Sequence, residues 1–196
     1  MNLEKLREAE ALFLERYPAG FADEELQPIL KKHNVGKLTD TATAALAPDR
    51  FRRQGQVLDD IVKIVSRSSM VSMFEKPKFR DYVQGLGRND RTLLAGGFRN
   101  LLHGDQPQGF ADIVAALSDG RLAKWSLLTI CPFYYRPSEE VFVKPTTTKN
   151  AIRQFELEGL TYRPRPSWEF YAAYRDAIDA MKARVHPSLA PNNDVC

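Results

Sequence analysis

The stretch LAKWSLLTICPFYYRP, residues 122–137, is nearly all apolar on every side of a helical projection. A helix that is hydrophobic all round has to be buried among other elements. We therefore predict a buried helix here that ends at Pro132, because proline lacks a backbone N–H and disfavours a helix interior. Cys131 lies within this run and is expected to be an unreactive core thiol.

Amphipathic segments on both sides of this stretch are suited to cover such a helix. Residues 49–70 have apolar side chains at helical spacing, and residues 88–105, 107–121 and 167–185 repeat the pattern. Gly104, Gly120 and Pro187 follow three of these segments and are typical helix stops. The sequence predicts a mainly α, compact multi-helix domain.

The residue composition changes near residues 140–163. EEVFVKP (139–145) and EGLTYRP (158–164) are short and rich in β-branched or aromatic residues, and each ends in a basic residue followed by proline. This composition favours strands. We predict a minor two-strand β element flanking a helix at about residues 147–157.

No convincing linker divides the chain into independent domains. Residues 1–49 are predicted to form a helical N-terminal lead-in packed on the main body. Residues 50–186 are expected to form the main helical domain, and the polar residues 187–196 a flexible tail.

Composition excludes several classes of protein. The 196 residues are 43% hydrophobic and 27% charged, which is typical of a globular domain. Two cysteines, Cys131 and Cys196, are too few for a disulfide framework and favour a reducing, cytoplasmic location. No apolar run is long enough for a membrane span, and the N-terminal segment is too charged for a signal peptide.

The charge is segregated although the net charge is only +3. Residues 50–103 hold 11 basic and 5 acidic side chains. Within this region, Arg50, Arg52 and Arg53 precede a predicted helix, where positive charge opposes the helix dipole. Guanidinium groups there are suited to phosphate. The alternative is a solvated helix end paired with nearby aspartates.

Residues 144–149, KPTTTK, contain a second group of candidate anion ligands. A helix N-terminus usually has an acidic side chain in its first turn, but here Lys144 and Lys149 flank three threonines. Lys144, Thr147 and Lys149 are therefore predicted to bind an anionic group such as phosphate. The alternative is an ordinary threonine cap with exposed lysines.

An aromatic-x-Lys-Pro pattern occurs twice, in FEKPKFRDY (74–82) and in FVKP (142–145). Lys76 and Lys78 lie in the first copy, and further basic-proline steps follow at residues 162–166. Aromatic rings interleaved with cations can stack on bases and bind phosphates. The alternative is that these rings anchor loops to the core.

Nothing in the sequence indicates catalysis. The histidines, His33, His103 and His186, are far apart in the chain, no metal-ligand spacing occurs, and no cofactor is expected. We therefore expect a non-enzymatic binding or accessory protein that contacts nucleic acid or another polyanion through its basic middle. The alternatives are a protein-interaction or structural subunit that uses the aromatic, proline-rich segment 132–171, and an enzyme for a phosphate-bearing ligand.

Overall fold

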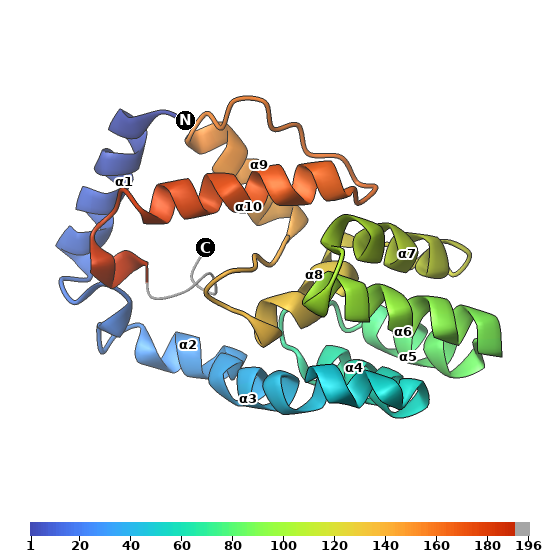
Figure 1. Ribbon diagram of the computed structural model, residues 1–196. Helices are drawn as coiled ribbons and strands as arrows, with labels where there is room; N and C mark the ends of the chain where they lie inside the picture. Colours follow the sequence, from blue (N-terminus) through green and yellow to red (C-terminus); the bar gives the residue numbers. More distant parts are fainter. Residues whose placement is uncertain (191–196) are drawn as a thin grey trace.

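The computed structural model describes residues 1–190, and helices hold 70% of them. The α-helices are α1 (Leu3–Arg16), α2 (Gln27–His33), α3 (Val35–Ala45), α4 (Gln54–Arg67), α5 (Glu75–Gly85), α6 (Arg88–His103), α7 (Gln106–Ser118), α8 (Trp125–Tyr135), α9 (Pro145–Gln154) and α10 (Trp168–Lys182) (Figure 1). The short 3-10 helices are η1 (Gly20–Ala22), η2 (Pro48–Arg52) and η3 (Pro187–Leu189). The predicted mainly α class is confirmed.

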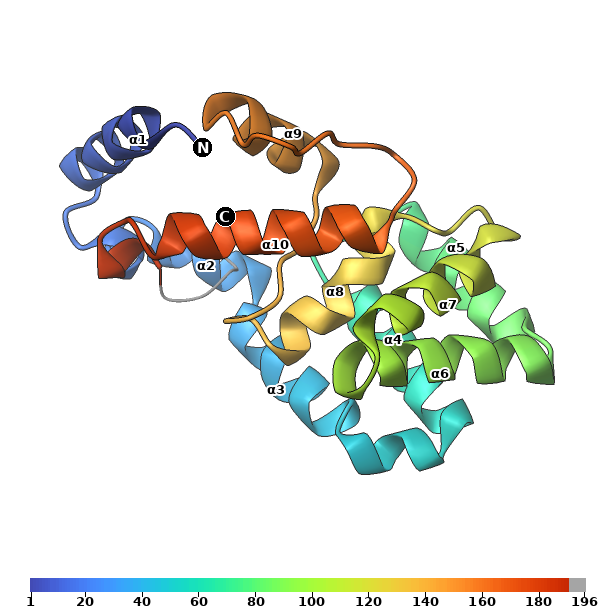
Figure 2. The same cartoon turned by 45° about the horizontal axis from the view of Figure 1, so that its top comes forward.

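Helix α8 lies at the centre of this arrangement (Figures 1 and 2). Every residue from Leu127 to Tyr134 is buried, and α3, α4, α6 and α7 pack around the helix. The prediction that Pro132 ends the helix is wrong, because α8 continues to Tyr135. The proline costs about 3 kcal/mol in a helix interior. Burying the apolar surface of Phe133 and Tyr134, at roughly 2 kcal/mol for each large side chain, offsets that cost.

The predicted two-strand β element is absent, since no strand occurs within residues 1–190. Residues 140–144 leave α8 without regular structure, and side chains from the helices take their backbone groups. The Val143 N–H donates to Thr129 Oγ1 at 3.1 Å, and the Val141 carbonyl accepts from the Tyr171 hydroxyl at 3.3 Å. Similarly, Trp125 Nε1 donates to the Arg163 carbonyl at 2.8 Å. Because these backbone groups are hydrogen-bonded to side chains, they need no partner strand.

The N-terminal region packs on both the middle and the end of the chain. Helix α3 contacts α8, the Asn2 N–H donates to the Phe155 carbonyl at 2.8 Å, and Gly20 packs against Ser188. Gly20 has a φ of +60°, which favours glycine at this turn. The division into a lead-in, a main domain and a tail stays a prediction. Residues 191–196 of that tail lie outside the described residues.

Helices α6 and α7 form a close antiparallel pair because glycine replaces side chains at their contact (Figure 2). A Cβ atom on Gly109 would meet the backbone nitrogen of Leu101 and would lie 2.6 Å from the Gly97 carbonyl oxygen. All of these contacts would be with backbone atoms of α6, so no flexible side chain could move aside to make room. The pair therefore depends on the missing Cβ at Gly109.

Gly109→Ala is expected to lower the free energy of unfolding by about 3 kcal/mol, because overpacking against backbone forces the two helices apart. Urea denaturation followed by circular dichroism measures this change. Gly96→Ala is the matched control, since a Cβ there meets nothing within 4 Å. It should leave stability unchanged or raise it by about 0.5–1 kcal/mol through helix propensity. Equal effects of the two substitutions would contradict the close contact.

Candidate functional site

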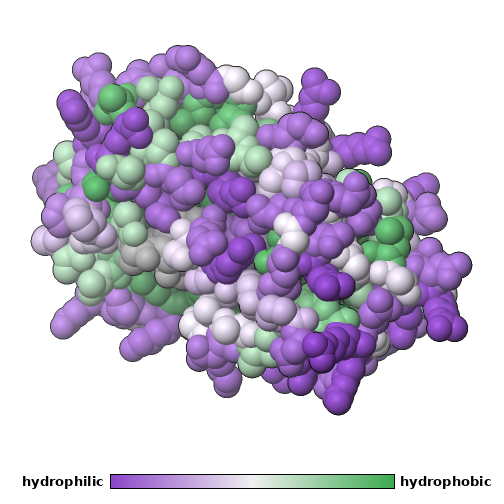
Figure 3. Space-filling model, in the orientation of Figure 1, coloured by the Kyte–Doolittle hydropathy of each residue, from purple (hydrophilic) through white to green (hydrophobic). Residues whose placement is uncertain are grey.

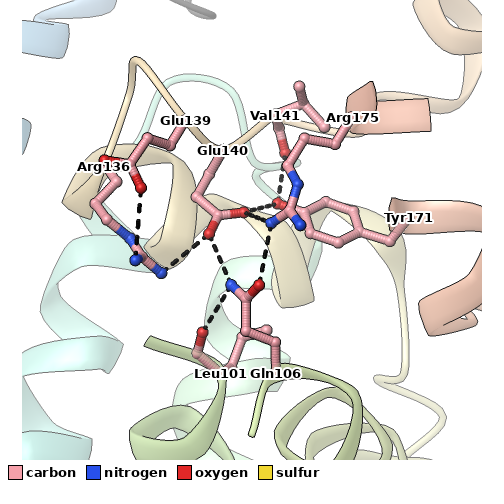
Figure 4. A network of polar contacts seen from close by, with 8 residues as sticks. All are labelled: Leu101, Gln106, Arg136, Glu139, Glu140, Val141, Tyr171 and Arg175. Carbon is pink, nitrogen blue, oxygen red and sulfur yellow. Dashed lines mark hydrogen bonds and ion pairs between the residues drawn. The ribbon is translucent and has the colours of Figure 1, made fainter. Parts of the chain in front are cut away.

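Glu140, just after α8, carries a carboxylate that is 1% exposed and fully engaged (Figure 4). Its Oε1 accepts from Gln106 Nε2 at 3.0 Å and Arg136 Nη2 at 3.1 Å. Its Oε2 accepts from the Tyr171 hydroxyl and from Arg175 Nη1, each at 2.9 Å. The donors come from α7, from the residue after α8 and from α10. Glu140 thus joins three helices at one point.

The network around Glu140 stabilises the fold and leaves little room for acid–base chemistry. With two donors on each oxygen, the carboxylate has no free lone pair directed at a substrate. Burial, with the adjacent charge of Glu140, raises the pKa of Tyr171 well above its ordinary value, so the hydroxyl stays a donor. Burial lowers the pKa of Arg175, but the carboxylate more than offsets this, and the net shift is upward.

A polar hollow of about 460 Å³ opens beside this network. Its lining mixes both signs of charge, because Glu139, Asp176 and Asp179 lie there with the two arginines. Such a balance suits neither a simple anion nor a simple cation. Within the described residues, no group of three or more His, Cys, Asp or Glu side chains could hold a metal ion.

The predicted anion ligands around residues 144–149 do not form one cluster. Helix α9 begins at Pro145, earlier than predicted, with Lys144 at the N-cap and no side-chain cap. Thr147 lines a groove between α9, α10 and α1, whereas the Lys149 ammonium lies 5.5 Å from the centre of the Tyr162 ring. Residues two apart on a helix point about 200° apart, which explains this divergence. Anion binding by these three residues stays a prediction.

The groove beside Thr147 is mainly apolar and has a volume of about 380 Å³. Helix α1 forms one wall, and its N-terminal end is held to the end of α9 by a Lys5–Glu156 ion pair at 2.6 Å. Figure 3 shows that most of the surface in this view is hydrophilic, with hydrophobic residues in separate small areas. No large apolar face is therefore visible from this side.

The arginines at residues 50–53 lie far from α9. They belong to η2 and the start of α4, and η2 lies on the opposite side of α8 from α9 in both ribbon views (Figures 1 and 2). Arg50 forms a 3.6 Å ion pair with Asp60, whereas Arg52 and Arg53 are exposed without an ion pair among the described residues. The structure thus separates two of the predicted basic groups.

A different set of basic residues is brought together around Trp125. Its indole N–H binds the Arg163 carbonyl, and its ring lies 6.4 Å from the Tyr162 ring, over which Lys149 extends. The neighbouring Lys124 forms a 3.1 Å ion pair with Glu75, at the start of α5. These contacts join segments that are far apart in sequence. We call the cationic residues of these joined segments the basic face: Lys76, Lys78, Lys124, Lys149, Arg163 and Arg165.

The sequence singled out Lys76, Lys78 and Lys149 of this face, and it indicated Arg163 and Arg165 only through the basic-proline steps at residues 162–166. Lys124 was missed. The Glu140 network was missed entirely, because its donors lie up to 35 residues away along the chain.

No known protein family, curated protein or solved structure matches this chain. Within residues 1–190, no helix combines the length and apolar character that a bilayer-spanning segment requires.

Glu140→Gln is expected to lower the free energy of unfolding by about 3–5 kcal/mol, because it leaves two arginines beside a buried neutral group. Thermal and urea denaturation measure the loss. Glu139→Gln provides the matched control, since Glu139 is 65% exposed and only 3.6 Å from Arg136. The control should change stability by less than about 0.5 kcal/mol. Similar losses in both variants would show that the buried network is not what stabilises this region.

Cys131 is buried in α8 as predicted, and burial raises the pKa of its thiol to about 12. The thiolate, which is the reactive form, is therefore scarce at neutral pH. A Cys196→Ser variant should react with a thiol reagent only as fast as the protein unfolds, and urea should accelerate the reaction. Rapid labelling of the native protein would contradict this burial.

Proposed function

We propose that the protein is a non-enzymatic binding protein for nucleic acid and that the basic face is its contact surface. The observation that supports this most strongly is the joining of separate basic segments around Trp125. The indole hydrogen bond to residue 163, the ring contact with Tyr162 and the Lys124–Glu75 ion pair hold these segments next to one another. A set of cations held on one surface is suited to a backbone of phosphates.

The charge balance of the basic face supports the same proposal. Lys76, Lys78, Arg163 and Arg165 have no ion-pair partner among the described residues. Lys149 contacts a ring rather than a carboxylate, so its charge is not neutralised. Only Lys124 is paired, with Glu75. Most of the positive charge is therefore available to an anionic partner.

A protein partner is the second candidate, and the apolar groove beside α1 is the feature that favours it. Ala151 and Phe155, from the segment 132–171, line that groove. Phe133, Tyr134 and Tyr171 of the same segment are buried and so have no surface for docking. The nucleic-acid proposal therefore has broader support. A phosphate-ligand enzyme has the least, because Thr147 and Lys149 diverge.

Charge reversal at two exposed positions tests the proposal. The double variant Lys78→Glu/Arg165→Glu should lose affinity for short DNA and RNA, single-stranded and duplex alike. Each phosphate contact removed should lower the slope of log affinity against log salt by about one unit. Fluorescence anisotropy with labelled oligonucleotides at two or more salt concentrations measures both quantities.

Arg52→Glu/Arg53→Glu is the matched control, because it reverses the same number of exposed charges at the distant start of α4. It should retain most of the affinity. Equal losses in both double variants would show that the contact is not confined to the basic face. No binding by the unaltered protein at low salt would overturn the proposal and favour a protein partner.

A further inference from the structure

Two large hydrophobic side chains beside the basic face are unusually exposed. Met73 and Phe74, immediately before α5, are each 74% exposed. No other large hydrophobic residue among residues 1–190 reaches that exposure. Exposing an aromatic ring gives up the stabilisation that burial provides. Single exposed hydrophobic residues are common on protein surfaces, and what sets this ring apart is the unpaired cation on the same face of its helix.

The backbone that carries Phe74 is firmly anchored. Upstream, the Ser68 hydroxyl is buried and lies 2.9 Å from the Tyr134 hydroxyl, and Val71 is buried. The Phe74 N–H donates to Ser72 Oγ at 3.3 Å. Downstream, Glu75 accepts from Ser126 at 2.9 Å and pairs with Lys124. The ring is thus presented from a fixed base, and binding through it would cost little ordering entropy.

The charges near Phe74 leave two ammonium groups free. Glu75 is neutralised by Lys124 at 3.1 Å, and Asp81 pairs with Arg80 at 2.8 Å. Lys76 and Lys78 have no acidic partner among the described residues. Lys78 lies one helical turn after Phe74 and therefore on the same face of α5, whereas Lys76, two residues after the ring, points about 200° away. An exposed ring and one unneutralised cation thus share a face, an arrangement that complements a base next to its phosphate.

We infer that Phe74 stacks on an unpaired base while Lys78 contacts a flanking phosphate, so that the preferred ligand is single-stranded nucleic acid. This inference rests on the proposed function and specifies its ligand. Bases inside a duplex are stacked on both sides and offer no free face to Phe74. The lysine alone binds both forms, because phosphates are present in each. The ring therefore supplies the preference for the single strand.

The apolar part of this surface is too small for the main alternatives. Two adjacent side chains fall far short of a stable protein interface, which buries about 800 Å² on each partner. They also provide little apolar area for anchoring in a membrane. Stacking on a base needs only one ring. A membrane surface remains a measurable outcome of the test below.

Phe74→Ala is expected to weaken binding of single-stranded oligonucleotides about 10-fold and to leave duplex affinity and the salt slope unchanged. Met73→Ala is the matched control, because its side chain is equally exposed but has no ring, and it should bind like the unaltered protein. Phe74→Trp should keep the affinity and should show fluorescence quenching by the single strand beyond that of the unaltered protein. Folding is checked by circular dichroism, and neither exposed position should affect it.

The outcomes separate this inference from the proposed function. If Phe74→Ala binds single strands as the unaltered protein does, while Lys78→Glu/Arg165→Glu loses affinity, the stacking inference is wrong and the proposed function stands. If the unaltered protein binds no nucleic acid, both fall. Co-sedimentation with phosphatidylserine vesicles is run in parallel. Vesicle binding that both Met73→Ala and Phe74→Ala abolish, with oligonucleotide binding intact, would assign the surface to a membrane and overturn the inference.

Discussion

Complete burial of α8 is the constraint on which the rest of the structure depends. A helix without a polar side has to be enclosed, and α3, α4, α6 and α7 surround it. Its few polar atoms then work inside the core: Thr129 binds the Val143 backbone, and the Tyr134 hydroxyl meets that of Ser68. Because buried polar groups must be paired, these atoms fix the segments that enter and leave the helix. The anchoring of the loop before Phe74 is one consequence.

The buried Glu140 is a second feature that fixes how the helices of this core are positioned. A lone carboxylate would be strongly unfavourable at 1% exposure, but two arginines, a glutamine and a tyrosine surround it. The arrangement gives α7, α8 and α10 one relative position, since moving any of them would break a hydrogen bond or an ion pair to the buried carboxylate. We regard Glu140 as a determinant of shape, and the function proposed for the protein lies on a different surface.

The two copies of the aromatic-x-Lys-Pro pattern show why local sequence did not settle function. Phe142, in the second copy, packs against the core with its ring 6.1 Å from that of Phe133. Phe74, in the first copy, projects into solvent. The alternative that such rings anchor loops thus holds for one copy and fails for the other. Both segments contact α8, since Glu75 next to Phe74 accepts from Ser126. The two copies differ in whether the ring faces the core, and the short pattern does not specify that direction.

The sequence by itself determined the helical class, the burial of α8 and the buried state of Cys131, because these follow from the periodicity and density of apolar residues along the chain. It misled at residues 140–163, where composition favoured strands but side chains of Thr129, Trp125 and Tyr171 took the backbone groups. The sequence also misled at Pro132, where burial of the helix in the core outweighed the cost of a proline in the helix interior. The Glu140 network, the contact at Gly109 and the basic face around Trp125 were decided by the tertiary structure alone. Each brings together residues that are distant along the chain, and such proximity is set by packing, which local pattern does not record.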